Sequence, residues 1–436
     1  MWRVAAPLVV LCVAATTLAP VSGCKQQDPV TTRPAPSSRP AAPLVAITGN
    51  EKGFIRPCGC SKPALGGIHR RAHALAELRH GGRSVEAISC GNLVTEGGRQ
   101  QEVKLETFLL ALADMNYAAL VPGPGEFLLG LPVLRDMRML APFPWVLANV
   151  EATELGLVPS VRLESAGVTV VGLIGKLGLA TGVKVKPAAT SLAEMFPTLP
   201  KGRILVVFNG PDEEAAGIAA AIPVDRRHET DLLVPGHADA PGYLEPRNPA
   251  TRIFVAGSKG RNIALWTPSL NKYEGLRLEE SRPGTETMDA LLDRYRTTVR
   301  EELLATKIGR LPSVQKYVGD QRCIECHDDI HAKLKPTPHQ RAFATLVDTK
   351  DEADPECAKC HVTGWGVESG YVDATTTPQH RDVNCESCHG PGSDHVEAMA
   401  KTPGGKVTTS SCQRCHDADN SPTFDFKKYW PKIEHK

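Results

Sequence analysis

The sequence has few aromatic residues and almost no net charge. Aromatic residues make up 5% of its 436 residues, whereas hydrophobic residues of all kinds make up 42%. A core built from this chain must therefore be mostly aliphatic, unless part of it is something other than side chains. Lysine and arginine number 50 and aspartate and glutamate 49, a formal net charge of +1. The chain thus lacks the strongly basic composition of many nucleic-acid-binding proteins, and we expect no nucleic acid as a partner.

A hydrophobic run long enough to span a membrane is missing from the N-terminal segment. Its apolar stretch covers residues 5–19, which is too short to cross a bilayer. Arg3 precedes this stretch and the sequence VSGC follows it at 21–24, an order typical of a cleaved signal peptide. The small residue before Cys24 resembles the bacterial lipobox, so we predict a lipoprotein signal peptide at 1–23 and acylation of Cys24. An ordinary signal peptide followed by a chance cysteine is the alternative.

The segment 24–43 has almost no aliphatic side chains and is rich in proline, serine and threonine. Such a composition cannot bury enough surface to fold, and we predict a flexible tether. Lys25 follows the predicted lipid site, which favours the outer over the inner membrane in Gram-negative cells. We therefore expect a chain that is lipid-anchored at the periplasmic face of a bacterial membrane, with that membrane as one partner.

Eight of the 13 cysteines repeat one pattern, C-x-x-C-H: CIECH at 323–327, CAKCH at 357–361, CESCH at 385–389 and CQRCH at 412–416. This is the attachment motif of c-type heme. Two thiols on one side of a helical turn form thioethers with the heme, and the adjacent histidine ligates the iron. Zinc knuckles and disulfides are the alternatives, but neither needs a histidine after every second cysteine. We predict four heme c groups, attached through Cys323, Cys326, Cys357, Cys360, Cys385, Cys388, Cys412 and Cys415, with His327, His361, His389 and His416 as proximal iron ligands.

Five further histidines in the same region are candidates for the second axial position: His339, His395, His380, His331 and His435. They suffice for four bis-His hemes, a ligation that leaves no place for a substrate and favours lower potentials than methionine. His339 follows Thr337-Pro338, a predicted helix start. His395 follows a tight turn at 390–392, so these two are the best placed. The other three could equally be surface side chains.

The region 317–436 is thin in aliphatic residues, so the porphyrins would form much of its core, within short helices and loops. It resembles the tetraheme cytochrome c family that includes the electron acceptor of hydroxylamine oxidoreductase in nitrifying bacteria. The resemblance rests on YVG at 317–319, TPH at 337–339, CHVTG at 360–364 and CESCHGPG at 385–392. It implies closely stacked heme pairs, mostly bis-His, with one iron sometimes five-coordinate. It also implies electron transfer to a redox protein partner that the sequence does not identify.

The region 44–282 alternates apolar strand-like runs with helical stretches, which predicts an α/β layered domain. It resembles the metallophosphoesterase family, to which the periplasmic nucleotidases belong. NEKG at 50–53 stands where that family has Asp-x-His-Gly, and Gly91-Asn92 stands at its Gly-Asp. The other matching positions are GPGEF at 123–127 for Gly-Asn-His-Glu-Phe, Asn209 for a lone His, and GHAD at 236–239 for Gly-His-x-His. The strand-like runs are 44–48, 84–89, 118–121, 145–147, 168–174, 204–208, 232–234 and 252–256, and the helical stretches are 68–79, 103–115, 131–140 and 212–221.

Phosphoester cleavage in that family needs two metal ions held by Asp, His and Asn. Here only His237 remains at these positions, and Lys52 puts a cation where a ligand should be. We therefore expect a degenerate phosphoesterase-like domain that has lost most of its metal ligands. For the whole protein, electron transfer is favoured over enzymatic activity. His237 is expected to be an ordinary loop residue.

Cys12 lies in the predicted signal peptide, which leaves three further cysteines: Cys58, Cys60 and Cys90. The sequence PCGC at 57–60 looks like a motif of divergent phosphoesterase relatives found beside cytochromes. In an oxidising compartment we expect a disulfide from Cys90 to Cys58 or Cys60, with a three-thiolate metal site as the alternative.

The segment 283–316 has apolar residues at helical spacing and is predicted to be a linker helix packing on one domain or both. A dimeric coiled coil is the alternative.

The sequence thus predicts a multidomain chain, with a metallophosphoesterase-like α/β layered domain followed by a mostly α-helical, loop-rich multiheme cytochrome c domain. Electron transfer is the favoured function. A heme-based reductase, a metal-dependent phosphoester hydrolase and an adaptor lipoprotein of a respiratory complex are the alternatives.

Overall fold

The computed structural model describes residues 41–57, 62–178, 182–236, 238–244, 251–399 and 406–435. The signal peptide, most of the tether, Cys24, Cys58, Cys60 and His237 lie outside the described residues. None of the helices in the described ranges is long and apolar enough to cross a membrane. Residues from Ala41 onward form one compact unit.

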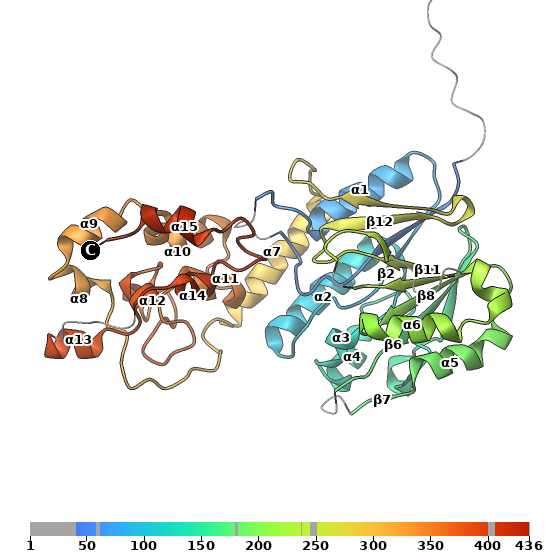
Figure 1. Ribbon diagram of the computed structural model, residues 1–436, viewed down its shortest axis with the longest axis horizontal. Coiled ribbons are helices and arrows are strands. Elements are labelled where there is room, and N and C mark those ends of the chain that lie inside the picture. Colours follow the sequence, from blue (N-terminus) through green and yellow to red (C-terminus); the bar gives the residue numbers. More distant parts are fainter. Residues whose placement is uncertain are drawn as a thin grey trace, which may run out of the picture. The chain divides into compact units, whose positions relative to one another are not determined.

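Two β-sheets dominate the α/β region (Figure 1). The first has the order β13-β12-β1-β2-β3, in which β1, β2 and β3 are parallel and β12 and β13 are antiparallel to their neighbours. Its strands are β1 (Leu44–Thr48), β2 (Val85–Ser89), β3 (Tyr117–Leu120), β12 (Asn262–Thr267) and β13 (Lys272–Arg277).

The second sheet has the order β10-β11-β9-β8-β6-β5, with a parallel centre and antiparallel edges. Its strands are β5 (Ser160–Leu163), β6 (Val168–Ile174), β8 (Arg203–Asn209), β9 (Thr230–Val234), β10 (Gly242–Leu244) and β11 (Arg252–Val255). A small ribbon pairs β4 (Val150–Glu151) with β7 (Lys184–Val185).

Strand β6 shows why the region is layered. Every residue of β6 is buried, as expected for a strand covered on both faces. Val168 and Val170 belong to the core cluster that also contains residues of the first sheet, such as Ile47. Val171 and Leu173 belong to a second cluster, shared with helices α5 and α6. Because side chains alternate along a strand, one face of this sheet packs on the first sheet and the other on helices.

Helices cover the outer faces of both sheets. Figure 1 shows α5 and α6 side by side along the sheet that contains β6 and β8. Helix α1 contacts β2 and helix α2 contacts β3, and both helices also contact α7. The helices of this part are α1 (Ile68–His80), α2 (Arg99–Asp114), α3 (Pro124–Phe127), α4 (Leu131–Arg138), α5 (Ala188–Met195), α6 (Asp212–Ala221) and α7 (Glu286–Glu301). The expected α/β layered fold is the fold observed.

Two sequence predictions need correction. The run 145–147 is not a strand, since Trp145 and Val146 form only isolated bridges. The linker helix is shorter than 283–316, because α7 ends at Glu301 and Leu303 already has a positive φ of 53°. The apolar stripe of α7 is as expected, with Met288, Leu292 and Tyr295 among its buried residues. This stripe packs on α2 and α1.

The C-terminal region has short helices joined by long loops (Figure 1). Its side-chain core within the described residues is small, a cluster of Phe343, Val362 and Tyr371. The helices are α8 (Asp320–Ile324), α9 (Asp328–Leu334), α10 (Ala342–Thr349), α11 (Pro355–His361), α12 (Cys385–His389), α13 (Ser393–Ala398), α14 (Thr409–Gln413) and α15 (Phe426–Tyr429).

Candidate heme-binding site

Each C-x-x-C-H motif lies on or at the end of a short helix: the four motifs fall on α8, α11, α12 and α14. In the first motif the His327 N–H donates to the Cys323 carbonyl at 3.0 Å, and in the fourth the His416 N–H donates to the Cys412 carbonyl at 2.9 Å. These are single helical turns, which place both thiols of a motif on the same side. The local geometry is therefore suited to thioether attachment.

Three of the four proximal histidines face a candidate distal histidine. The ring centroids are 6.2 Å apart for His327 and His395, and 5.8 Å apart for His389 and His435. His416 faces His339 at 6.1 Å. An iron held between two imidazoles, with each nitrogen about 2 Å away as in other metal–histidine bonds, places the centroids about 6 Å apart. The side chains thus fit three bis-His irons.

The remaining histidines are placed differently. His361 of the second motif has its Nδ1 2.6 Å from the Ala342 carbonyl oxygen and 3.3 Å from the Thr345 hydroxyl. A proton held on Nδ1 by such a partner leaves Nε2 for a metal. His380 is buried and packs edge-on against Tyr317. Within the described ranges, the structure brings neither His380 nor His331 against a proximal histidine ring.

The surroundings of the distal histidines were only partly predictable. Pro338 does begin a helical turn, but it is a 3-10 turn, and the Thr337 hydroxyl donates to the Leu334 carbonyl instead of capping it. Sequence reasoning missed Ser421, whose hydroxyl lies 3.0 Å from Nδ1 of His416, and Phe424, whose ring stacks on that imidazole at 4.6 Å. No motif marks either residue, because both reach His416 through a non-repetitive loop.

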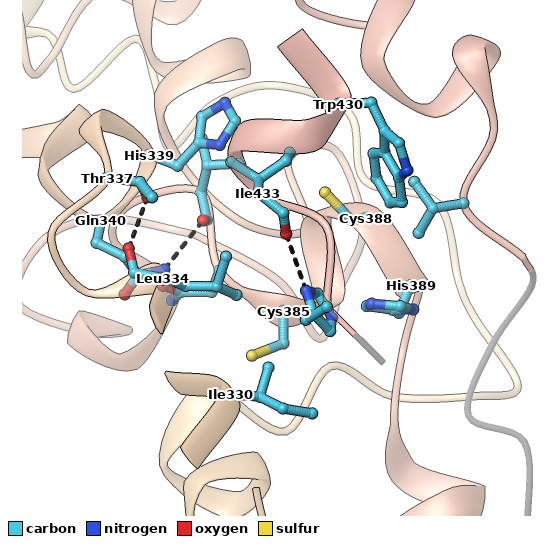
Figure 2. A pocket seen from close by; sticks show the side chains of 14 residues that line it. Ile330, Leu334, Thr337, His339, Gln340, Cys385, Cys388, His389, Trp430 and Ile433 are labelled. Carbon is cyan, nitrogen blue, oxygen red and sulfur yellow. Dashed lines mark hydrogen bonds between the residues drawn. The ribbon is translucent and has the colours of Figure 1, made fainter. Parts of the chain in front are cut away.

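A pocket surrounds the third motif. Its empty space of about 530 Å³ includes open solvent, so the pocket is partly open. Cys385, Cys388 and His389 converge on it with Trp430 and Ile433 from the C-terminal helices (Figure 2). His339 and His435 also line the pocket, so two thiols, three imidazoles and apolar walls meet there. This combination fits a covalently attached porphyrin.

Thiols of different motifs lie near one another. The Cys385 thiol lies within hydrogen-bond reach of Cys323 and raises the pKa of Cys323, and the Cys415 thiol does the same to the pKa of Cys360. The first motif is therefore beside the third, and the second beside the fourth. Burial and the Cys412 thiol also raise the pKa of Cys388, so the third motif lies near the fourth as well.

Glu386, between the two cysteines of the third motif, holds neighbouring segments in place. Its carboxylate accepts hydrogen bonds from the backbone N–H groups of Val318, Gly319 and Gly392 at 2.8 to 3.1 Å. The first two residues precede α8, and Gly392 precedes the helix of His395. Sequence reasoning missed this role, because a glutamate inside C-x-x-C-H reads as an exposed spacer.

Three asparagines at positions that resemble the phosphoesterase motifs form hydrogen bonds within the α/β region. The Asn92 amide donates to Oδ1 of Asn209 at 3.4 Å, and Asn209 donates to the Val121 carbonyl at 3.1 Å. The Asn50 amide donates to the Gly236 carbonyl at 2.7 Å. An amide oxygen can hold one metal ion, but a dinuclear centre also needs carboxylates and imidazoles, and these three positions supply none. The residues present do not fit the dinuclear metal centre of a phosphoesterase.

Carboxylates near these positions have structural partners. Glu126 is fully buried and accepts hydrogen bonds from the N–H groups of Asn92, Leu93 and Gly123, and burial raises its pKa to about 7. Glu51 forms a buried ion pair with Arg71 at 2.6 Å, and burial raises the pKa of Glu51.

Cys90 is fully buried and forms no disulfide with another described residue. Burial, aided by the charge of Glu51, raises the pKa of Cys90. Because Cys58 and Cys60 lie outside the described residues, the pairing of these three cysteines stays a prediction.

Comparison with known proteins identifies the C-terminal region. Residues 322–390 match the family described as cytochrome c554 and c-prime. Cytochrome c-554 of Nitrosomonas europaea is 38% identical over 91 residues, a match that covers 17% of this chain and 39% of that cytochrome. The chain thus spans about two fifths of the length of this relative. The predicted resemblance of the C-terminal region to this cytochrome family is confirmed over residues 322–390, and a cytochrome c family implies covalently bound heme c.

The α/β region is similar to phosphoesterases of known structure. A 5′-nucleotidase precursor from Thermus thermophilus is 18% identical with a TM-score of 0.49, covering 64% of this chain and 63% of that chain. The calcineurin-like phosphoesterase YfkN from Bacillus subtilis is 15% identical with a TM-score of 0.46, covering 60% and 98%. Such likenesses concern the fold alone and carry nothing about activity.

Proposed function

We propose that this chain is an electron-transfer protein with four heme c groups, lipid-anchored at the periplasmic face of a bacterial membrane, where it exchanges electrons with a redox protein partner. The observation that carries the proposal is a set of three histidine pairs whose ring centroids are 5.8 to 6.2 Å apart. One histidine of each pair belongs to a C-x-x-C-H motif. The helix of the second motif, α11, lies in the same region and supplies its own thiols and histidine.

The side chains favour electron transfer over substrate turnover. Heme iron, when bound, supplies one-electron chemistry. Two imidazoles on one iron leave no open position, so His395, His339 and His435 would each exclude a substrate from one iron. Fixed axial ligands are a condition under which a protein tunes a potential rather than catalyses a reaction.

Localisation rests on the sequence. A signal peptide at 1–23 followed by Cys24 supports export and acylation. Heme c is attached outside the cytoplasm, so export is also what the four motifs require. The membrane anchor and the redox partner therefore belong to the same proposal.

Phosphoester hydrolysis is not proposed. Asn50, Asn92 and Asn209 stand where the family has metal ligands, and each already hydrogen-bonds within the protein. In the part of the chain that the structure describes, no group of three or more histidine, cysteine, aspartate or glutamate side chains is arranged to hold a metal ion.

The test is the mass and spectrum of full-length protein produced in a host that attaches heme c. We expect a mass equal to the mature polypeptide with four hemes and a lipid, and a reduced spectrum dominated by low-spin heme c. A mass without heme, or a protein without Soret absorption, would contradict the proposal.

A further inference from the structure

The helix of the second motif is anchored to the α/β region at its first turn. Asp354 is the N-cap of α11, and its side chain accepts a hydrogen bond from the Glu356 N–H at 2.9 Å. The same carboxylate accepts from Gln100 of α2 at 2.8 Å and from the Tyr295 hydroxyl of α7 at 3.1 Å. A cap of this kind fixes the start of a helix. Here it also ties that start to two helices of the other region.

Ion pairs add to this anchor, and in each of them the cation and the carboxylate come from the same two parts of the chain. Asp351 is almost fully buried and pairs with Arg56 at 2.8 Å and with Arg296 at 2.9 Å. Glu356 pairs with the buried Lys104 at 2.5 Å. Arg300 pairs in the same way with Glu352, at 3.0 Å. Every cation comes from the α/β region or α7, and every carboxylate from the segment 351–356.

Arg56 reaches the heme attachment residue itself. Its Nη2 lies 3.5 Å from Sγ of Cys357, the first cysteine of the second motif. The other ion pair between the two regions, from Lys259 to Asp419, lies in the loop after the fourth motif. Arg56 is four-fifths buried, so its charge acts on Cys357 with less screening than a charge in water.

We propose that Arg56 is a positioning residue of the second heme, so that the degenerate phosphoesterase-like region forms part of that heme site and raises its reduction potential. This inference rests on the proposed function, since it requires heme c at Cys357 and Cys360. Reduction adds a negative charge to a heme, and a fixed cation nearby stabilises the reduced form. Asp351 offsets part of this effect, because it is the anion closest to Arg56.

The test is a potentiometric titration of full-length holoprotein, followed optically. In Arg56→Gln one midpoint potential should become more negative, changing the oxidised-to-reduced ratio of that heme about three- to tenfold at the wild-type midpoint. Asp351→Asn should move the same midpoint in the positive direction. Arg56→Lys keeps the charge and should stay near wild type. Arg294→Gln is the matched control, because Arg294 lies on α7 but pairs with Glu106 of α2.

The two charge-removing variants separate electrostatics from structural damage. Unchanged potentials in Arg56→Gln, or shifts of the same sign in Arg56→Gln and Asp351→Asn, would overturn the inference. If Arg56→Gln does not mature, the other two variants decide the inference. Asp351→Asn should shift the midpoint potential in the positive direction, and Arg56→Lys should leave it unchanged. The heme content by mass is measured in parallel. Four hemes with unmoved potentials would remove only this inference, whereas wild-type protein without heme would remove the proposed function.

Discussion

The α/β region buries its aliphatic side chains in two extensive clusters, whereas the described part of the cytochrome region has one cluster of Phe343, Val362 and Tyr371. Both regions are parts of the same chain, so the difference reflects what fills each core. Burial of apolar side chains is sufficient for the two sheets and their helices. In the cytochrome region, covalently attached heme must supply the missing apolar volume, as structural metals do for small domains.

Withholding heme should break this comparison most strongly. When the chain is expressed without heme c maturation, residues 317–436 should lose their fold, while residues 44–282 keep theirs because their core is made of side chains. Hydrogen exchange or limited proteolysis of the protein with and without heme measures this loss of fold directly. Protection of α8 to α14 in protein without heme would show that the polypeptide alone holds the cytochrome region together.

The α/β region should instead be destabilised by a change within its own core. Arg71→Met leaves Glu51 as an unpaired charge that is completely buried, and we expect a loss of about 3–5 kcal/mol in unfolding free energy. Denaturant unfolding of holoprotein, followed by far-UV circular dichroism, measures it. The control is Arg135→Met, at an exposed pair with Asp136, which should cost little. Equal effects of the two variants would mean that Glu51 is neutral in the folded protein.

Glu126 should make the stability of the α/β region depend on pH. Its pKa is raised by burial from 4.5 to about 7, so the folded protein binds a proton between these values that the unfolded chain has lost. Unfolding free energy should therefore fall as pH rises from about 4.5 to about 7, by roughly 3 kcal/mol, and then level off. Glu126→Gln should lose this slope, whatever its own effect on stability. A slope that persists in the variant would assign it to another group.

The smallest change is local to one iron. His435→Ala should leave the cytochrome folded and convert one low-spin heme to a high-spin or water-ligated form, because His435 faces His389 at 5.8 Å. His331→Ala is the matched control and should leave the spectrum unchanged. Absorption and electron paramagnetic resonance spectra of the oxidised proteins compare them. The same spectrum in both variants would remove His435 as a ligand.

The sequence predicted local features better than distant pairings. The run 44–48 became β1 because uninterrupted apolar residues have few alternatives to a buried strand. The run 145–147 did not form a strand, because Trp145 makes only one bridge to β3. The motif cysteines were recognisable because attachment chemistry fixes their spacing. The partners of His327 and His389 were not, since they depend on how loops between short helices fold. The contacts of Arg56 with Asp351 and Cys357 join segments about 300 residues apart, and no local pattern encodes them.

The central claim is that paired histidines hold hemes in the cytochrome region. Near-infrared magnetic circular dichroism of the oxidised full-length protein identifies axial ligand pairs and gives the number of irons of each type. At least three low-spin bis-His irons are predicted, from His327 with His395, His416 with His339 and His389 with His435. Fewer than three such irons in fully heme-loaded protein would contradict it.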